Sequence, residues 1–561
     1  MKNHSLLWIV LFLIGAGLRF VDLWHPVDRE SWREGDMAAV ARNFDREGMN
    51  ILYPQIDWRG EGPGYAEMEF PVYPWLIALS YKIFGQNDIA GRLLSYLFSL
   101  LSIILFFLMS RRWLPPPGSY MAGLFFVFSP LIIQISNAIQ PEPLMLLLDL
   151  IAVYAFVLWI EKNRWKYFVM AAIATSLALL VKINNAYLGL LFLFILFDRQ
   201  KMKMLSDYRI YLFGLIALLP PVLWYSFAND FWITYGNSLG LSNEYHWIGL
   251  DFFTKSYFIK GIVLNELYFV IMPSAFLVIL YALVFSKWKE NQVLRYGIFW
   301  FGAVYIYYII TCRTTADKWS MYYHCISVPP AALLFGFGLN VILKTEKFRH
   351  IFQLLFTAIL LSIVLVLANH FGLFSNRSNT LAEILILFGF VSLFLVCFIL
   401  WKKVRSKGLS FITLGKYNLP SLIAMVFVMV TLFYQALKIR SQFQLNIPSV
   451  YYSCSDDIAS IIPKKSLIIA SGGPLEDFTG YPVAYNASYF FYWLDRKGFN
   501  IPIEEQRLEK IKEFKTKGAD FFVAEEKIIK DAGDFEQDLK KQYELLYSCN
   551  GVLVFDLRSD K

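Results

Sequence analysis

Charged residues are scarce in this chain: Asp, Glu, Lys and Arg make up 17% of its 561 residues. A soluble domain carries about 25% charged and about 45–50% apolar residues. Here 57% of the residues are hydrophobic, and the mean hydropathy is +0.48. This balance excludes an ordinary soluble enzyme, a coiled coil and a disordered chain. Most of the chain is therefore expected to lie in a lipid bilayer.

Cysteine and histidine are also rare, and neither is clustered. The six histidines are scattered, and the cysteines form no C-x-x-C pair: Cys312, Cys325, Cys397, Cys454 and Cys549. Such spacing gives no metal-ligand pattern. No D-x-D pair typical of a divalent-metal site is present either, so we expect no metal and no other cofactor.

The net charge of +8 comes from 52 basic and 44 acidic residues. In a soluble protein this excess could indicate binding to nucleic acid. Here the basic residues lie between apolar runs, where Lys and Arg determine how a membrane protein is oriented. We therefore expect no nucleic-acid partner.

Long apolar runs dominate the sequence. A helix needs about 20 apolar residues to cross a bilayer, and the runs predict about thirteen spans, of which the fifth and sixth are short. The first is not a signal peptide, because no small-residue cleavage site follows Trp24. The predicted spans are 5–24, 88–110, 119–138, 143–160, 166–181, 184–197, 208–227, 265–286, 294–312, 324–343, 350–369, 380–401 and 418–437.

The loops alternate sharply in their basic content. One set carries Arg111, Arg112, Lys162, Arg164, Lys166, Arg199, Lys201, Lys203, Lys287, Lys289, Lys344, Lys347, Arg349, Lys402, Lys403, Arg405 and Lys407. The alternate short loops carry only Lys182, Arg313, Lys318 and Arg377. The positive-inside rule places the first set, and the N-terminus with it, in the cytoplasm. An odd number of spans then places the C-terminus outside.

The longest segments between or after the spans all fall on the outer side: 25–87, 228–264 and 438–561. An enzyme with this organisation would do its chemistry outside the cytoplasm. We predict a membrane part at 1–437 and an outer domain at 438–561.

The C-terminal segment has the pattern of a small soluble α/β domain. An amphipathic helix is predicted at 503–517, with Gly518 as its stop. Cys454 and Cys549 would both face an oxidising compartment, where a disulfide between them is one option. A lid or docking role is the simplest expectation for this domain. Its predicted strands are 467–471, 519–525 and 551–557.

The first outer segment is dense in charged and aromatic residues, including Arg33, Arg59 and Glu69. Residues 36–47 are predicted as a helix with Asp36 near its N-terminus, where a carboxylate is favoured. Its apolar face (Ala39, Val40 and Phe44) suits the membrane surface. Residues 72–84 form a second apolar stretch that is too short to span. The alternative is a solvated loop whose charges have no role.

Further charges lie at the outer ends of the spans. Glu142 stands between two prolines, Lys182 interrupts an apolar run, and Arg92 opens the second span. The loop before the tenth span contributes Lys318, Tyr322, Tyr323 and His324. Each has an ordinary alternative: a water-exposed turn acid, a snorkelling lysine or an interfacial aromatic belt. Together they indicate a polar cavity, reached from the lipid, that suits an anionic head with a lipid tail.

These motifs resemble the GT-C glycosyltransferases, in the branch of the lipid A aminoarabinose transferases and the protein O-mannosyltransferases. The similarity rests on WREGDMAAVARNF, LYPQIDWRG, EFPVYPWLIALSYKIFG, QPEPLM, the VK pair and KWSMYYHCISVPP, in this order. It covers roughly residues 1–340 and is topological beyond them. It implies a multi-pass α-helical membrane fold with a C-terminal α/β domain.

The resemblance implies roles for single residues. Asp36 would be the catalytic carboxylate and Glu142 the second acid. Donor binding would fall to Arg33, Arg92, Lys182, Lys318, Tyr322, Tyr323 and His324. Arg59 and Glu69 would support the loop or the acceptor. The chain departs from the aminoarabinose transferases before the second surface helix, where Glu69-Phe-Pro71 replaces a basic KPP-like motif.

The implied reaction transfers a sugar from a polyprenyl-phosphate donor to an extracytoplasmic acceptor, in the inner membrane of a bacterium. Asp36 would take the proton of the acceptor hydroxyl, and a single displacement would invert the anomeric centre. The competing interpretation is a transporter or flippase of a lipid-linked sugar. Transporters often contain internal repeats and broken helices near the midplane. This chain has no evident repeat, and its charges gather at one face. A third interpretation, a scaffold built on 438–561, leaves the first outer segment unexplained.

Overall fold

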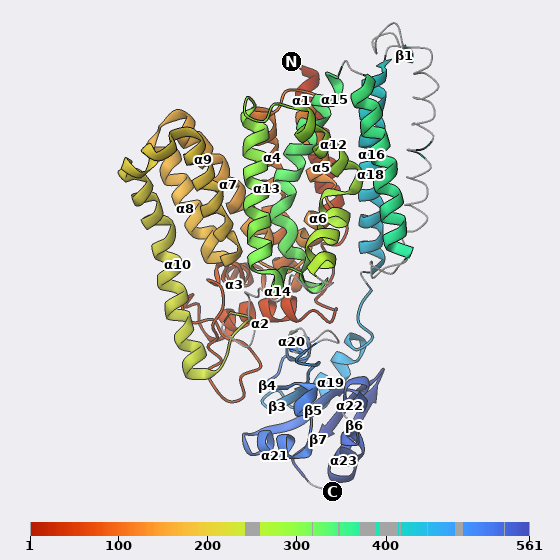
Figure 1. Cartoon of the computed structure of the whole chain (residues 1–561). Helices are drawn as coiled ribbons and strands as arrows, with labels where there is room; N and C mark the ends of the chain where they lie inside the picture. The colour runs from red at the N-terminus through yellow and green to blue at the C-terminus, as the bar shows by residue number, and fades with distance from the viewer. Residues whose placement is uncertain are drawn as a thin grey trace.

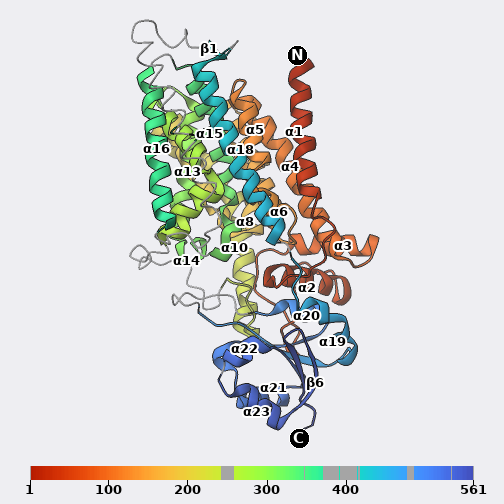
Figure 2. The same cartoon turned by 90° about the vertical axis from the view of Figure 1, so that its right-hand side faces the viewer.

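The structure is a computed structural model. It describes residues 2–241, 258–316, 318–345, 348–370, 389, 391, 413–414, 417–445, 447–476, 486–531 and 533–559. A large helical bundle forms one end of the molecule and a small α/β domain forms the other (Figures 1 and 2). The chain therefore has the two-part organisation that its composition predicts.

The bundle confirms the predicted multi-pass helical class. Twelve of the thirteen predicted spans coincide with helices or helix pairs, and 380–401 lies almost wholly outside the described residues. The helices are α1 (Lys2–Phe20), α4 (Asp88–Trp113), α5 (Gly118–Val127), α6 (Pro130–Ser136), α7 (Glu142–Lys162), α8 (Trp165–Val181), α9 (Tyr187–Gln200), α10 (Tyr208–Tyr235), α12 (Pro273–Phe285), α13 (Gln292–Ile310), α14 (Cys312–Thr315), α15 (Val328–Leu343), α16 (Phe348–His370) and α18 (Leu419–Leu445). Shorter turns are η1 (Ile183–Ala186), η2 (Lys201–Ser206), η4 (Ile259–Leu264), η5 (Glu266–Ile271) and η6 (Lys318–Ser327).

The helices differ in length. Within the described residues, 6 are long and apolar enough to cross a membrane, and up to 8 if each bent pair counts as one span. The pairs α5–α6 and η4/η5–α12 bend by 48° and 97°. Pro130 and Pro273 open the second helix of each pair, and proline disfavours helical geometry in the residue before it. These bends let two predicted spans form from broken helices.

Among the described residues, the basic loops that follow α4, α7, α9 and α12 lie at the end of the bundle away from the α/β domain (Figure 1). Arg112 pairs with Glu161 at 2.5 Å, and Gln292 donates to the same carboxylate at 3.1 Å. These contacts join the last turns of α4 and α7 to the first residue of α13. The alternation of charge along the sequence therefore corresponds to two ends of one bundle.

The first outer segment folds into α2 (Trp32–Glu47) and α3 (Val72–Phe84). The predicted start of α2 at Asp36 is wrong. Ser31 accepts a hydrogen bond from the Glu34 N–H at 3.2 Å, so this Ser-x-x-Glu capping pattern begins the helix one turn earlier. Asp36 therefore lies in the second turn.

The predicted membrane-surface face of α2 is also wrong. Ala39, Val40 and Phe44 are buried, because α2 packs between α3 and the C-terminal domain. The prediction for the apolar stretch 72–84 agrees better with the structure. Ile83 and Phe84 at the end of α3 are 69% and 76% exposed. Of α2 and α3, only α3 therefore exposes apolar side chains at the surface of the protein.

The C-terminal domain is a mixed sheet with the order β4-β3-β5-β7-β6, in which β3 is parallel to β4 and β5, and β7 is antiparallel to β5 and β6. Strands β3 (Leu467–Ser471), β5 (Ala519–Glu525) and β7 (Val552–Asp556) confirm the predictions, while β4 (Lys497–Ile501) and β6 (Glu544–Cys549) were not predicted. Its remaining helices are η9 (Tyr452–Cys454), α19 (Ser455–Ile461), α20 (Ser488–Leu494), η10 (Ile503–Glu505), α21 (Leu508–Thr516), α22 (Glu526–Asp531) and α23 (Phe535–Gln542). A two-stranded ribbon, β1 (Thr413–Leu414) and β2 (Tyr417–Asn418), lies elsewhere, before α18.

Cys454 and Cys549 form a disulfide with a Cα–Cα distance of 6.1 Å. It joins η9 to the end of β6 and so confirms the pairing left open by the sequence. The predicted domain division at 437/438 remains a proposal, since α18 continues to Leu445.

The domain docks on α2 through α20 (Figure 2). Arg42 donates to the Tyr492 carbonyl at 2.9 Å, and Ser488 donates to the Trp32 carbonyl at 2.8 Å. A Cβ at Gly35 would lie 3.1 Å from the Tyr489 nitrogen, so only glycine allows this approach without displacement. The docking expectation is consistent with these contacts.

Candidate active site

A buried ion pair joins the first residue of α7 to the residue that ends α8. Glu142 and Lys182 are 0% and 1% exposed, and the Lys182 ammonium donates to Glu142 Oε1. Lys182 stops α8 because its backbone turns to the extended region. A buried charge is costly unless it is paired, so neither the exposed turn acid nor the snorkelling lysine describes these residues.

Two tyrosines from η6 cover this lysine. The Lys182 Nζ lies 4.8 Å from the ring centre of Tyr322 and 4.6 Å from that of Tyr323. Aromatic faces at this range attract a cation. Tyr322 and Tyr323 thus belong to the same cluster as the ion pair, as the resemblance implied.

Arg33 of α2 supplies a second cation. Its Nη2 lies 3.2 Å from Glu69 Oε1, and both side chains are buried. Burial alone would raise the pKa of Glu69, but the charges of Arg33 and Lys182 outweigh it and hold that pKa below its usual value. The two cations are therefore electrostatically coupled through one carboxylate.

Asp36 lies one turn after Arg33 and is 1% exposed. The Trp58 indole donates to Asp36 Oδ1 at 3.0 Å. Burial raises the pKa of Asp36 to about 7, against the opposing effects of Trp58 and Arg33. A carboxyl group with this pKa can both accept and release a proton near neutrality.

Three of these charged groups keep an unsatisfied polar atom. Arg33 Nε, Asp36 Oδ2 and Glu142 Oε2 are buried and have no hydrogen-bond partner within the described ranges. In folded proteins, nearly all buried polar atoms have a hydrogen-bond partner. A group of such atoms on neighbouring charged side chains indicates a place for a polar ligand.

Arg92 lies outside this cluster. It donates to Glu34 Oε2 at 3.0 Å, to the His25 carbonyl at 2.6 Å and to the Pro26 carbonyl at 2.8 Å, and it also contacts the Asn137 carbonyl. These contacts engage all three guanidinium nitrogens. Arg92 therefore holds α4 against α2 and the segment that precedes it. The donor contact that the resemblance implied for Arg92 remains a prediction.

The other predicted residues have separate positions. His324 Nδ1 lies 2.5 Å from Glu266 and its Nε2 lies 2.8 Å from the Thr315 carbonyl, so both ring nitrogens are engaged within the bundle. Arg59 pairs with Glu47 at 2.9 Å and donates to the Pro63 carbonyl at 2.7 Å, which fits loop support. Lys318 begins η6, and its side chain lies outside the described part of the structure.

Three partners of the predicted site residues were not themselves predicted. Trp58 binds Asp36, Glu34 binds Arg92, and Glu266 binds His324. Glu34 stood three residues after Ser31 in a capping pattern, which was a usable signal. Glu266 lies in an apolar run, where an acid by itself indicates a buried partner. Trp58 carried no such signal.

Within the described ranges, no group of three or more His, Cys, Asp or Glu side chains could hold a metal ion. The expectation of metal-independent chemistry remains a prediction.

Comparison with known proteins gives a match to a family model over part of the chain and a shared fold. Residues 68–224 match the family model of dolichyl-phosphate-mannose-protein mannosyltransferases. This segment contains Glu69, Arg92, Glu142 and Lys182. No curated protein sequence matches the chain significantly.

Solved structures match over nearly the whole chain. ArnT from Cupriavidus metallidurans bound to undecaprenyl phosphate is 14% identical with a TM-score of 0.61, and the match covers 98% of both chains. The archaeal oligosaccharyltransferase AglB from Archaeoglobus fulgidus, in complex with an inhibitory peptide and a dolichol-phosphate, is 12% identical with a TM-score of 0.55; the match covers 98% of this chain and 74% of AglB. These are GT-C glycosyltransferases, and the chain has their fold. The predicted resemblance is confirmed.

Proposed function

We propose that this chain is an integral membrane glycosyltransferase that transfers a sugar from a polyprenyl-phosphate donor to an extracytoplasmic acceptor. One observation carries the proposal: three coupled, buried charged groups each keep an unsatisfied polar atom, at the end of the bundle that faces the α/β domain. Such a site suits a ligand with a phosphate and a hydroxyl group. The fold shared with ArnT and AglB supports the same class of reaction.

Lys182 and Arg33 would bind the donor phosphate. An ammonium and a guanidinium both make charge-assisted hydrogen bonds to phosphate. Glu142 and Glu69 would hold the cations in place before the donor arrives. The same cations would stabilise the phosphate as it becomes the leaving group.

Asp36 would act as the general base. Trp58 occupies its Oδ1, which leaves Oδ2 to accept the proton of the acceptor hydroxyl. A pKa of about 7 suits this task, because the group is half deprotonated at neutral pH and still basic. Attack of the acceptor oxygen on the anomeric carbon in a single displacement would invert that centre.

The ligands named with the similar structures support a lipid-phosphate donor: undecaprenyl phosphate with ArnT, and a dolichol-phosphate with AglB. The donor's tail would enter from the side, between helices. The acceptor classes are lipid A, a surface glycan, a lipid or a protein. We place the enzyme in a bacterial inner membrane, with the N-terminus cytoplasmic and the α/β domain periplasmic.

The test is sugar transfer in membranes that contain the chain, with a panel of radiolabelled polyprenyl-phosphate sugars and envelope extract as acceptor source. Asp36→Asn should lose about 10²–10⁴-fold in rate. The control is Asp45→Asn on the same helix, because Asp45 pairs with the half-exposed Lys82 at 2.8 Å and is not part of the buried cluster. Full activity of Asp36→Asn would refute its role as base.

A further inference from the structure

A cavity of about 290 Å³ lies at the opposite end of the bundle from the candidate active site. It is lined by residues of α4, α7, α9, α13 and α15. Its depth is apolar and buried: Val153, Val157, Leu191, Ile195, Gly297, Trp300 and Leu333. Its rim is formed by Arg112, Trp113, Glu161, Gln292, Val293 and Tyr296. The cavity therefore combines an apolar interior with a polar mouth.

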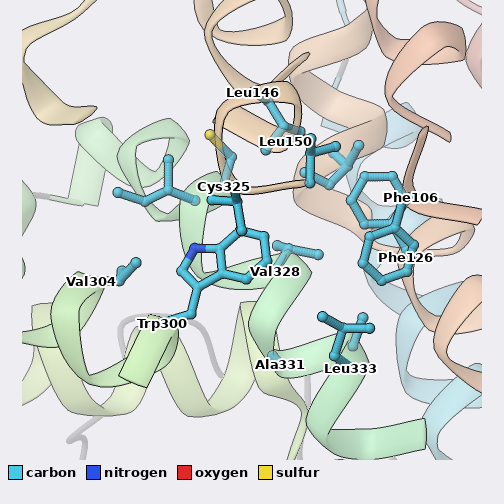
Figure 3. Packing of buried hydrophobic residues seen from close by; sticks show 14 of the residues in the cluster. Phe106, Phe126, Leu146, Leu150, Trp300, Val304, Cys325, Val328, Ala331 and Leu333 are labelled. Atoms are coloured by element: carbon cyan, nitrogen blue, oxygen red, sulfur yellow. The ribbon is translucent and has the colours of Figure 1, made fainter. Parts of the chain in front are cut away.

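This cavity is separate from the candidate active site. Val157 follows Glu142 by fifteen residues on α7, which corresponds to about 22 Å along the helix. A packed layer lies between them, in which Trp300 sits against Cys325 and Val328 (Figure 3). The cavity thus does not continue into the charged cluster.

Trp300 forms a fixed floor for the cavity. Its indole donates to the Tyr187 hydroxyl at 3.2 Å, and that hydroxyl donates to Asp149 at 2.5 Å. Both partners are buried. A floor held by two hydrogen bonds keeps the space open, because the indole cannot collapse into it without leaving a buried polar group unpaired.

The size of the cavity limits its occupant. An engineered cavity of about 150 Å³ lined by aliphatic and aromatic side chains stays dry and binds benzene. A volume of about 290 Å³ has room for part of one hydrocarbon chain but not for a whole polyprenyl tail. The apolar depth disfavours water and sugars.

The charge around the rim indicates what kind of headgroup the bound molecule carries. Arg112 pairs with Glu161, and Arg199 donates to the rim residue Tyr296 at 2.7 Å. Basic residues at these helix ends outnumber the acids Glu161 and Asp198: Arg111, Arg112, Lys162, Arg199 and Arg295. Such an excess attracts anionic lipid headgroups.

We propose that this cavity binds an acyl chain of an anionic phospholipid from the leaflet at the Lys- and Arg-rich end of the bundle. The chain would fill the space above Trp300, and the headgroup phosphate would lie on Arg112. This site is independent of the proposed sugar transfer.

Lipid retention by the purified full-length protein tests the proposal by native mass spectrometry. The probes are phosphatidylglycerol, phosphatidylcholine and undecaprenyl phosphate. Wild type should retain phosphatidylglycerol, and Val157→Phe, which fills the depth, should retain about tenfold less. Val169→Phe on α8, where Val169 is 44% exposed, is the matched control and should bind as wild type does. Arg112→Gln should lower the preference for phosphatidylglycerol over phosphatidylcholine by about fivefold.

Equal retention by Val157→Phe and wild type would overturn the proposal. Stronger retention of undecaprenyl phosphate that is also lost in Val157→Phe would overturn the phospholipid assignment. A second measurement needs no variant and is therefore independent of misfolding. Phosphatidylglycerol with a photoreactive group at the end of its acyl chain should cross-link wild type within the helices that line the depth of the cavity: 142–162, 187–200, 292–310 or 328–343. Cross-links confined to other helices would contradict the proposal.

Discussion

The Lys182–Glu142 pair allows stability and function to be separated. Lys182→Met leaves the Glu142 carboxylate buried at 0% exposure without its ammonium partner. Removing one partner of a buried pair costs about 3–5 kcal/mol, whereas replacing both by neutral groups is often close to neutral. We expect Lys182→Met to destabilise by this amount and Lys182→Met/Glu142→Gln to recover most of the loss.

Unfolding in detergent measures the stability, and sugar transfer in membranes measures the function. The double variant should be stable and nearly inactive, because the phosphate has lost its ammonium. The control is Lys82→Met/Asp45→Asn, a partly exposed pair at 2.8 Å whose loss should cost less than about 1 kcal/mol. A double variant that is both stable and fully active would refute the role of Lys182 in donor binding. A stable single variant would refute the burial argument.

Three further predictions concern Asp36, the disulfide and Arg92. Burial raises the pKa of Asp36 to about 7 from an unfolded value of about 3.9, so the folded protein loses stability as the pH rises from about 4 through 7. Asp36→Asn should therefore have a higher free energy of unfolding than wild type at pH 8, by up to about 4 kcal/mol, and the same free energy of unfolding at pH 4. A stability difference that does not change with pH would contradict this. Removing the Cys454–Cys549 disulfide, which spans 95 residues, should cost the α/β domain about 2–5 kcal/mol, and unchanged hydrogen-exchange protection of that domain would contradict it. Arg92→Met should cost about 3–5 kcal/mol because it unpairs buried Glu34, whereas Arg111→Met on the exposed surface should cost little. Normal stability with weakened donor binding would instead show that Arg92 binds the donor.

The membrane fold follows closely from the sequence because apolar runs of sufficient length have few alternatives in lipid. The positions at which two of the helices break were harder to predict. The prolines at 130 and 273 lie inside two predicted spans, where they bend the chain without ending its apolar character. Strands β4 and β6 were missed because KGFNI and ELLYSC mix polar and apolar residues without a strong pattern.

The candidate site was predicted in part. Glu142 and Lys182 were each noticed because a lone charge beside apolar runs is costly, yet their pairing depends on how α7 meets α8. Sequence periodicity carries no such information. Asp36 was noticed for its place in a charged segment, while Trp58, 22 residues later, orients it through a turn that no local pattern encodes.

The predicted membrane-surface face of α2 shows a different limit of prediction from sequence. Its apolar face indicated a membrane contact because the sequence does not reveal what covers a helix. In the structure, Gly35 lies against the backbone of Tyr489, so the α/β domain covers one side of α2, while Val40 and Phe44 pack into the core of the bundle. Long-range docking of this kind depends on residues more than 400 positions away.

The most direct test of the account is the binding of undecaprenyl phosphate to the purified protein, measured for wild type and for Lys182→Met/Glu142→Gln. The account predicts that the variant, although folded, binds the lipid at least about tenfold more weakly, since one charge-assisted contact to phosphate contributes about 1.5–3 kcal/mol. Equal affinity in both proteins would contradict the claim that the buried cluster is the donor-phosphate site.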